Sequence, residues 1–116
     1  MGFITKRAQY LTVYKSGKTW VDNLIVVKAL PNELEFSRYG FSVAKEVGKS
    51  VVRNRVRRLL REIARITIVK SGLDIVFIAR PAAASADYHQ LKKSIEKLLL
   101  RANVINKDET VRAGVN

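Results

Sequence analysis

The stretch KEVGKSVVRNRVRRLLREIAR, residues 45–65, predicts the helix around which the rest of the chain is organised. Its apolar residues recur at spacings of three and four, which is typical of a helix packed on a core. They are Val52, Val56, Leu59, Leu60 and Ile63. Beside this stripe, an arginine stands at every fourth position: Arg53, Arg57, Arg61 and Arg65. Like charges at that spacing cost a helix about 1 kcal/mol over three steps. The ladder therefore indicates an anionic partner.

The whole chain is strongly basic. It has 116 residues, with 22 Lys and Arg against 10 Asp and Glu, and a formal net charge of +12. This length predicts a single domain with its own core, and 47% apolar content is typical of a globular protein. The charge favours nucleic acid as the partner, with an anionic membrane surface as the weaker candidate. No apolar run is long enough to predict a membrane span.

The residues that usually carry protein catalysis are scarce. The chain has no cysteine and one histidine, His89, which excludes disulfides, disulfide-linked partners and a Cys-based or paired-His metal site. The Asp and Glu residues are scattered, which argues against a two-metal protein nuclease. The sequence thus argues against a stand-alone enzyme but not against a role in a catalytic complex. Cytoplasmic localisation is expected.

The N-terminal part predicts a helix from about residue 5 to residue 16. Thr5 is a candidate N-cap, and Gly17 a candidate left-handed residue after the helix. Tyr10 and Tyr14 lie on one face of this helix. Two interpretations stay open for them: core residues, or a stacking platform for unpaired bases.

Strands are predicted on both sides of the central helix. Residues 20–30 are β-branched and form a strand that is either continuous or broken near residues 22–23, while residues 36–44 alternate as a half-buried strand. The polar face of this second strand either receives an RNA backbone or faces solvent. Residues 73–80 are almost continuously apolar, which predicts a strand covered on both sides.

Helix boundaries can also be predicted from the sequence. Ser50 is a candidate N-cap for the central helix, which is expected to run to about residue 68 or 69. Asp87 and Gln90 form a capping-box pattern for a last helix. The core stripe of that helix comprises Leu91, Ile95, Leu98 and Leu99. Residues 106–116 are expected to form a flexible tail after a domain of residues 1–105. This order predicts an α+β sandwich with a small sheet.

The string GFSVAKEVGKSVVRNRVRRLLRE, residues 40–62, resembles the protein subunit of bacterial ribonuclease P. Its most specific part is the Arg53-Asn54-Arg55 triplet with the upstream Lys45 and Gly48. The resemblance extends over about residues 5–101. It implies a single-domain α-β-β-β-α-β-α fold with a four-stranded sheet and a left-handed βαβ crossover. The general right-handed rule would not have predicted this crossover.

The resemblance also implies a function. Such a protein binds a large catalytic RNA and the single-stranded 5′ leader of precursor tRNA, so that the leader is removed by RNA-catalysed hydrolysis. The partners would be ribonuclease P RNA and precursor tRNA, with no membrane partner. Mg²⁺ would be held mainly by the RNA, and no catalytic residue is expected in the protein. The alternative is a general RNA-binding or ribosomal-type protein without a role in cleavage.

Site residues are carried over position by position. The expected contacts with the catalytic RNA are Lys45, Lys49, Arg53, Asn54, Arg55, Arg58 and Arg61. The expected contacts with the leader are Tyr10, Tyr14, Lys28, Ser42 and Arg57. Aromatic rings stack on unpaired bases, and Arg side chains grip phosphates bidentately. For Arg55, a second interpretation is that its stem packs beside the core while its charge stays in water.

The chain departs from the family pattern at a few positions. Ala44 replaces a usual Ser, Glu46 a usual Lys, and Lys28 stands where an aromatic residue is common. The family often has Phe at the positions of Tyr10 and Tyr14. These departures bear on the leader cleft rather than on the family.

Overall fold

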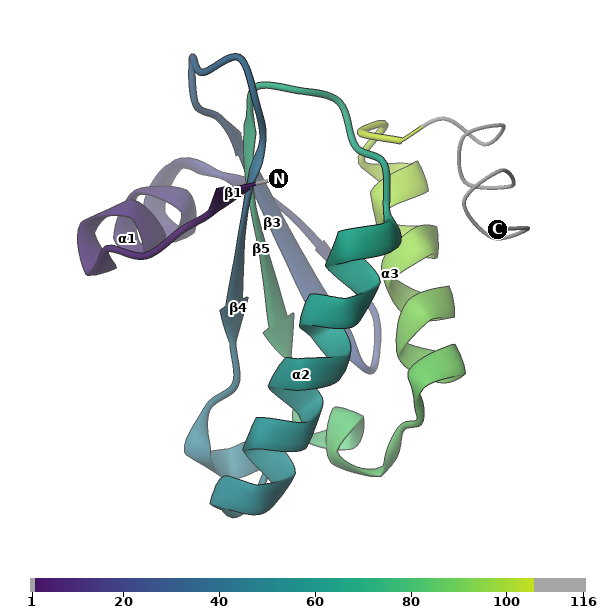
Figure 1. The fold of residues 1–116 in the computed structure, drawn as a ribbon. Coiled ribbons are helices and arrows are strands. Elements are labelled where there is room, and N and C mark those ends of the chain that lie inside the picture. The colour runs from purple at the N-terminus through teal and green to yellow at the C-terminus, as the bar shows by residue number, and fades with distance from the viewer. Residues whose placement is uncertain (1, 106–116) are drawn as a thin grey trace.

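The computed structural model describes residues 2–105, which form a mixed sheet with helices on both faces (Figure 1). The helices are α1 (Arg7–Ser16), α2 (Ser50–Ile66) and α3 (Tyr88–Arg101), with short 3-10 helices η1 (Lys45–Val47) and η2 (Pro81–Ser85). The strands are β1 (Gly2–Phe3), β2 (Lys18–Val21), β3 (Ile25–Pro31), β4 (Arg38–Ser42) and β5 (Leu73–Ala79). The predicted tail, residues 106–116, lies outside the described residues.

The sheet has the order β1-β4-β5-β3-β2. It contains five strands rather than the four expected, because Gly2 and Phe3 pair in parallel with Arg38 and Tyr39 at the edge of β4. A two-residue strand has no alternation that sequence reasoning could detect. The β4 and β5 strands are parallel neighbours joined through α2. Viewed from α2 with both strands pointing upward, β5 lies to the left of β4 (Figure 1), so the crossover is left-handed as expected.

The main core lies between the sheet and the helices α2 and α3. The predicted α2 stripe is confirmed, because Val56, Leu60 and Ile63 are fully buried, and the predicted α3 stripe is buried as well. Ile75 and Phe77 of β5 join this core. Between them, Val76 points to the opposite face and packs in a second cluster with Val13 of α1. The strand β5 is thus covered on both sides, as its apolar run predicted.

The strand predicted over residues 20–30 is broken, which was one of the two expectations. The strands β2 and β3 form an antiparallel hairpin, and Asp22 shapes the turn by accepting hydrogen bonds from Leu24 N and Ile25 N (both 2.9 Å). Its other carboxylate oxygen accepts a hydrogen bond from Ser94 of α3. Burial alone would raise the pKa of Asp22, but these hydrogen bonds and Lys97 hold it below its ordinary value.

Several predicted helix ends differ from the observed ones. Lys49, not Ser50, is the N-cap of α2. Ser50 is instead the first helical residue, and its hydroxyl accepts a hydrogen bond from Arg53 (3.2 Å). The helix α2 ends at Ile66, short of residues 68–69, where the Thr67 hydroxyl donates back to Ile63 O (2.7 Å). The capping box of α3 is confirmed, since Asp87 and Gln90 each accept a backbone N–H of the other at 2.9 Å.

The first helix ends at Ser16 as predicted, but its start and the conformation of Gly17 differ from the prediction. It begins at Arg7, and the Gln9 side chain accepts the N–H groups of Thr5 and Lys6 (both 3.2 Å). Gly17 is not left-handed, since its φ is −75°. A Cβ atom there would lie 2.6 Å from Val13 O, so glycine is needed for close approach and not for handedness. Within residues 2–105, no helix is both long and apolar enough to cross a membrane.

Candidate nucleic-acid interface

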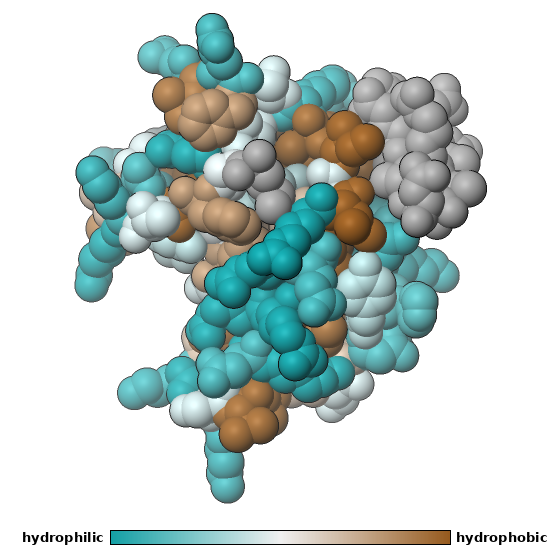
Figure 2. All heavy atoms as spheres, in the orientation of Figure 1, coloured by the Kyte–Doolittle hydropathy of each residue, from teal (hydrophilic) through white to brown (hydrophobic). Residues whose placement is uncertain are grey.

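Three arginines of the α2 ladder, Arg57, Arg61 and Arg65, lie along a groove beside the edge of the sheet. Because α2 turns by about 100° per residue, residues four apart stay on one flank, and this flank faces β4 and the N-terminal segment. A groove of about 480 Å³, here called the arginine groove, separates them. It is lined by Phe3, Ile4, Thr5, Tyr10, Tyr39, Phe41, Arg57, Arg61 and Arg65. Figure 2 shows hydrophilic side chains covering the outward face of α2.

Cationic and aromatic groups meet in the arginine groove. The guanidinium carbon of Arg61 lies 5.9 Å from the centroid of the Phe41 ring, which is within the range of a cation–π contact. The Phe41 ring also lies 6.1 Å from that of Phe3 on the N-terminal strand. Arg61 and Arg65 are exposed, and Arg57 is half-buried. The groove can therefore offer both phosphate contacts and apolar ring surface.

The two tyrosines of α1 extend this groove. Their rings are 6.2 Å apart and border a second groove of about 430 Å³, here called the tyrosine groove. It is lined by Thr5, Arg7, Tyr10, Leu11 and Tyr14. Thr5 and Tyr10 line both grooves, so the two are continuous. Both tyrosines are half-buried and pack against the Val13 cluster, which agrees with the core interpretation. The stacking platform stays a prediction.

Tyr10 is fixed in place by β4. Its hydroxyl accepts a hydrogen bond from Phe41 N (3.2 Å). The pairing of β1 with β4 ends at Tyr39, so Phe41 lies beyond it. The Tyr10 ring lies against Gly40, where a Cβ atom would be only 2.6 Å from the ring. Gly40 is thus the residue that lets the ring approach the strand.

Lys28 and Ser42 lie on the same face of the sheet as α1. The register pairs Lys28 with Val76 and Ser42 with Ile78, and the alternation of β5 places Val76 and Ile78 on that face. The Lys28 ammonium donates a hydrogen bond to the Thr19 hydroxyl (2.8 Å). Neither Lys28 nor Ser42 is among the residues that line the two grooves. The leader contacts expected from the sequence are therefore not all brought together.

A second basic region lies at the N-terminal end of α2. Lys45 and Lys49 are exposed, and Arg53 reaches back to Ser50. The Arg53 Nε atom is buried and has no hydrogen-bond partner in the described part of the chain. Gly48 permits the tight entry to the helix, with φ +157° and a hypothetical Cβ 3.0 Å from Val52. These cations surround free backbone N–H groups, an arrangement that favours phosphate.

The three residues of the Arg53-Asn54-Arg55 triplet point in different directions. Asn54 is exposed, and its side-chain oxygen accepts a hydrogen bond from Arg57 (3.2 Å). Arg55 lies on the flank opposite the ladder, where it donates to Ala84 O (3.5 Å) and Ala86 O (2.8 Å) around η2. Arg58 is exposed, 3.9 Å from Glu62. Arg55 therefore ties α2 to η2 in addition to any contact outside the protein.

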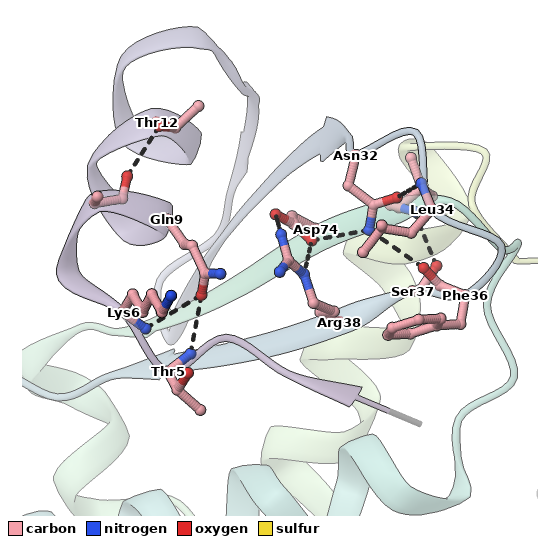
Figure 3. A network of polar contacts seen from close by, with 12 residues as sticks. Thr5, Lys6, Gln9, Thr12, Asn32, Leu34, Phe36, Ser37, Arg38 and Asp74 are labelled. Atoms are coloured by element: carbon pink, nitrogen blue, oxygen red, sulfur yellow. Dashed lines mark hydrogen bonds and ion pairs between the residues drawn. The ribbon is translucent and has the colours of Figure 1, made fainter.

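No sequence pattern indicated the polar network shown in Figure 3. Arg38 forms a bidentate ion pair with Asp74 (2.8 and 2.7 Å), and the Asn32 side-chain amide donates to the same carboxylate (2.9 Å). Burial alone would raise the pKa of Asp74, but Arg38 and Asn32 hold it below its ordinary value. The hydrogen bond from Arg38 to Asp74 in turn raises the pKa of Arg38. The Arg38 guanidinium is thus paired within the protein and does not face an RNA backbone.

Some groove residues were absent from the expected set. Phe3, Thr5, Phe41 and Arg65 line the arginine groove without having been predicted as contacts. Arg65 belongs to the ladder and could have been included on that ground, whereas Phe3 reaches the groove only because β1 pairs with β4. Among residues 2–105, no group of three or more His, Asp or Glu side chains could hold a metal ion.

Comparisons with known proteins agree with one another. A family model described as Ribonuclease P matches residues 3–103. The "Ribonuclease P protein component" of Caldanaerobacter subterraneus subsp. tengcongensis is 45% identical over 108 residues, covering 91% of this chain and 93% of that protein. The protein of the same name from Dehalococcoides mccartyi is 46% identical over 104 residues, covering 90% of this chain and 87% of that protein.

Solved structures are similar as well. The RNase P protein of Staphylococcus aureus matches with a TM-score of 0.83 and 32% identity, covering 91% of this chain and 99% of that one. The RNase P protein of Thermotoga maritima matches with a TM-score of 0.78 and 29% identity, covering 87% and 97%.

Proposed function

This chain belongs to the ribonuclease P protein family, and we propose that its two continuous grooves hold the single-stranded 5′ leader of precursor tRNA. Its role is that of the protein subunit of the ribonuclease P ribonucleoprotein, the endonuclease that removes the leader during tRNA maturation. The match over residues 3–103 sets aside the alternative of a ribosomal-type protein.

The composition of the grooves is the observation that carries this proposal. Together they are lined by four arginines and no acidic residue: Arg7, Arg57, Arg61 and Arg65. The aromatic rings of Tyr10, Tyr14 and Phe41 stand between them. Positive grooves with aromatic side chains are the usual means of binding a single strand, because every base has a face to stack and every nucleotide a phosphate.

The catalytic RNA is proposed to contact the other basic region. Four of its proposed contacts lie at the N-terminal end of α2 and are exposed or half-buried: Lys45, Lys49, Arg53 and Asn54. A fifth, Arg58, is exposed at the middle of the helix. Phosphates there would meet both the cations and the positive end of the helix dipole. Arg61, carried over as a contact with the catalytic RNA, lies in the arginine groove, and we assign it to the leader instead.

The protein's own residues bind and orient the substrate rather than break the phosphodiester bond. No group of three or more His, Asp or Glu side chains comes together among residues 2–105, and we propose that the RNA holds the Mg²⁺ ion. By fixing the leader, the grooves would position the scissile bond relative to the catalytic RNA, an effect of orientation. We further propose that the complex acts in the cytoplasm.

Reconstitution tests this function. The purified protein, the ribonuclease P RNA of the same cell, and both together are each incubated with precursor tRNA at low Mg²⁺. We expect cleavage only when both are present, and weaker binding of precursor tRNA by the Arg57→Ala protein. Cleavage by the protein alone would contradict the proposed mechanism.

A further inference from the structure

The geometry points to a distal subsite, beyond the arginine groove, that binds one further unpaired base of the leader against Phe36. This inference rests on the proposed function, because it extends the same path along α2. The subsite is a pocket of about 300 Å³, here called the distal pocket. It is lined by Glu35, Phe36, Ser37, Tyr39, Ala64, Arg65, Thr67, Ile68, Val69 and Ser71.

The distal pocket is continuous with the arginine groove. Arg65 and Tyr39 line both of them. The Phe36 ring packs against β1, because a Cβ atom at Gly2 would lie only 2.8 Å from it. A strand that follows the ladder from Arg57 past Arg61 thus reaches Arg65 and then the ring of Phe36.

The surface at this end of α2 is unusually apolar for an exposed region. Phe36, on the loop between β3 and β4, is 50% exposed, and Ile68, on the segment after α2, is 53% exposed. Both line the distal pocket. Figure 2 shows hydrophobic surface near the C-terminal end of α2 and on the loop between β3 and β4, on the same face as the hydrophilic surface of α2. An exposed aromatic ring beside a basic groove, such as that of Phe36, is typical of a platform for unpaired bases.

The loop that carries Phe36 is held in place by hydrogen bonds. The Asn32 amide that contacts Asp74 also donates to Phe36 O (3.2 Å), as Figure 3 shows. The next residue, Ser37, donates to Lys70 O and accepts from Leu73 N (3.0 Å). These bonds fix both sides of the pocket before anything binds, which reduces the entropy lost on binding.

The charges at the distal pocket would orient a bound nucleotide. Arg65 stands on the side of the arginine groove, whereas Glu35 stands in the distal pocket itself. A phosphate would be attracted by Arg65 and repelled by Glu35, so the backbone would stay at Arg65 and the base would point inward. The Glu35 carboxylate can then accept a hydrogen bond from an exocyclic amino group of the base.

The test uses the protein with its catalytic RNA and precursor tRNAs whose leaders are lengthened one nucleotide at a time. With the unaltered protein, the affinity of the complex for precursor tRNA should rise with leader length. The last increase in affinity should occur at the length at which a base reaches Phe36. Phe36→Ala should remove that increment, a loss of roughly fivefold or more, and leave short-leader binding unchanged. Phe36→Trp should retain it. Leu34→Ala is the matched control, because Leu34 is exposed on the same loop but does not line the pocket.

A second measurement needs no substitution. With 5-iodouridine placed singly along the leader, photo-cross-linking in the complex should join one distal position to Phe36. An unchanged increment in Phe36→Ala, together with no cross-link, would overturn the subsite. Arg57→Ala would then still report on the proposed function, because it acts on short leaders too. If Phe36→Ala instead altered self-association and not leader binding, the surface would be a protein contact and the inference would be wrong.

Discussion

Gly40→Ala tests whether Tyr10 packs against β4 as closely as the structure shows. A Cβ atom at position 40 would lie 2.6 Å from Cε1 and 2.9 Å from Cζ of Tyr10, closer than real Cβ contacts allow. The ring would have to leave the strand, and the hydrogen bond from Phe41 N to its hydroxyl would be lost. Overpacking of this kind costs about 1–3 kcal/mol. We expect Gly40→Ala to lower the free energy of unfolding by about that amount.

The effect should reverse when the ring is removed. In a Tyr10→Ala background nothing opposes a methyl group at position 40. In this background, alanine at position 40 should raise the free energy of unfolding by about 0.5–1 kcal/mol over glycine, because glycine loses more backbone freedom on folding. Gly40→Ala should then stabilise the protein. The two results together predict a coupling energy of about 1.5–4 kcal/mol between the two positions.

Urea unfolding of the four proteins, followed by the fluorescence of the single tryptophan, Trp20, measures this coupling. Equal costs of Gly40→Ala in both backgrounds would refute the packing. A second readout concerns function: because displaced Tyr10 no longer forms the groove wall, Gly40→Ala should weaken binding of precursor tRNA more than binding of mature tRNA. Equal losses of affinity for both RNAs would show that the packing of Tyr10 on Gly40 has no part in leader binding.

Three further predictions follow from the site. Arg53→Ala should make the salt dependence of catalytic-RNA binding shallower by about one phosphate contact. Arg55→Ala should mainly lower the melting temperature, since Arg55 donates to the carbonyls around η2. Equal changes in the salt dependence for the two variants would contradict this difference. Tyr14→Ala should weaken leader-containing substrate by about 1–3 kcal/mol relative to mature tRNA, and equal losses would make Tyr14 a core residue only. The folded-state pKa of Asp74 lies below its unfolded value near 3.8, so its contribution to stability is present above that pH and is lost as the pH falls through the folded-state pKa. Urea midpoints measured from about pH 5 to pH 2 should therefore fall less steeply for Asp74→Asn, and parallel curves would argue against the ion pair with Arg38.

Local patterns predicted the elements because short-range physics determines them. The spacing of Val56, Leu60 and Ile63 requires a helix with one buried face, and the alternation of residues 36–44 requires a strand with two different faces. The capping box at Asp87 is also local, since its two hydrogen bonds join residues three apart. The errors at Ser50 and Gly17 lie at helix ends, where contacts of single residues decide the boundary: Ser50 accepts a hydrogen bond from Arg53, and Gly17 lies close to Val13 O.

The sequence by itself determined that the central helix is basic on one flank and apolar on the other, and its triplet indicated the family. It did not determine what faces the arginines. Phe3 and Phe41 meet Arg61 only because β1 pairs with β4 and α2 crosses back over the sheet. Arg38 is paired with Asp74, 36 residues away, and Arg55 is turned toward η2, 29 and 31 residues away. Such pairings depend on long-range topology, so only the tertiary structure could distinguish the arginines that line the grooves from those that hold the fold together.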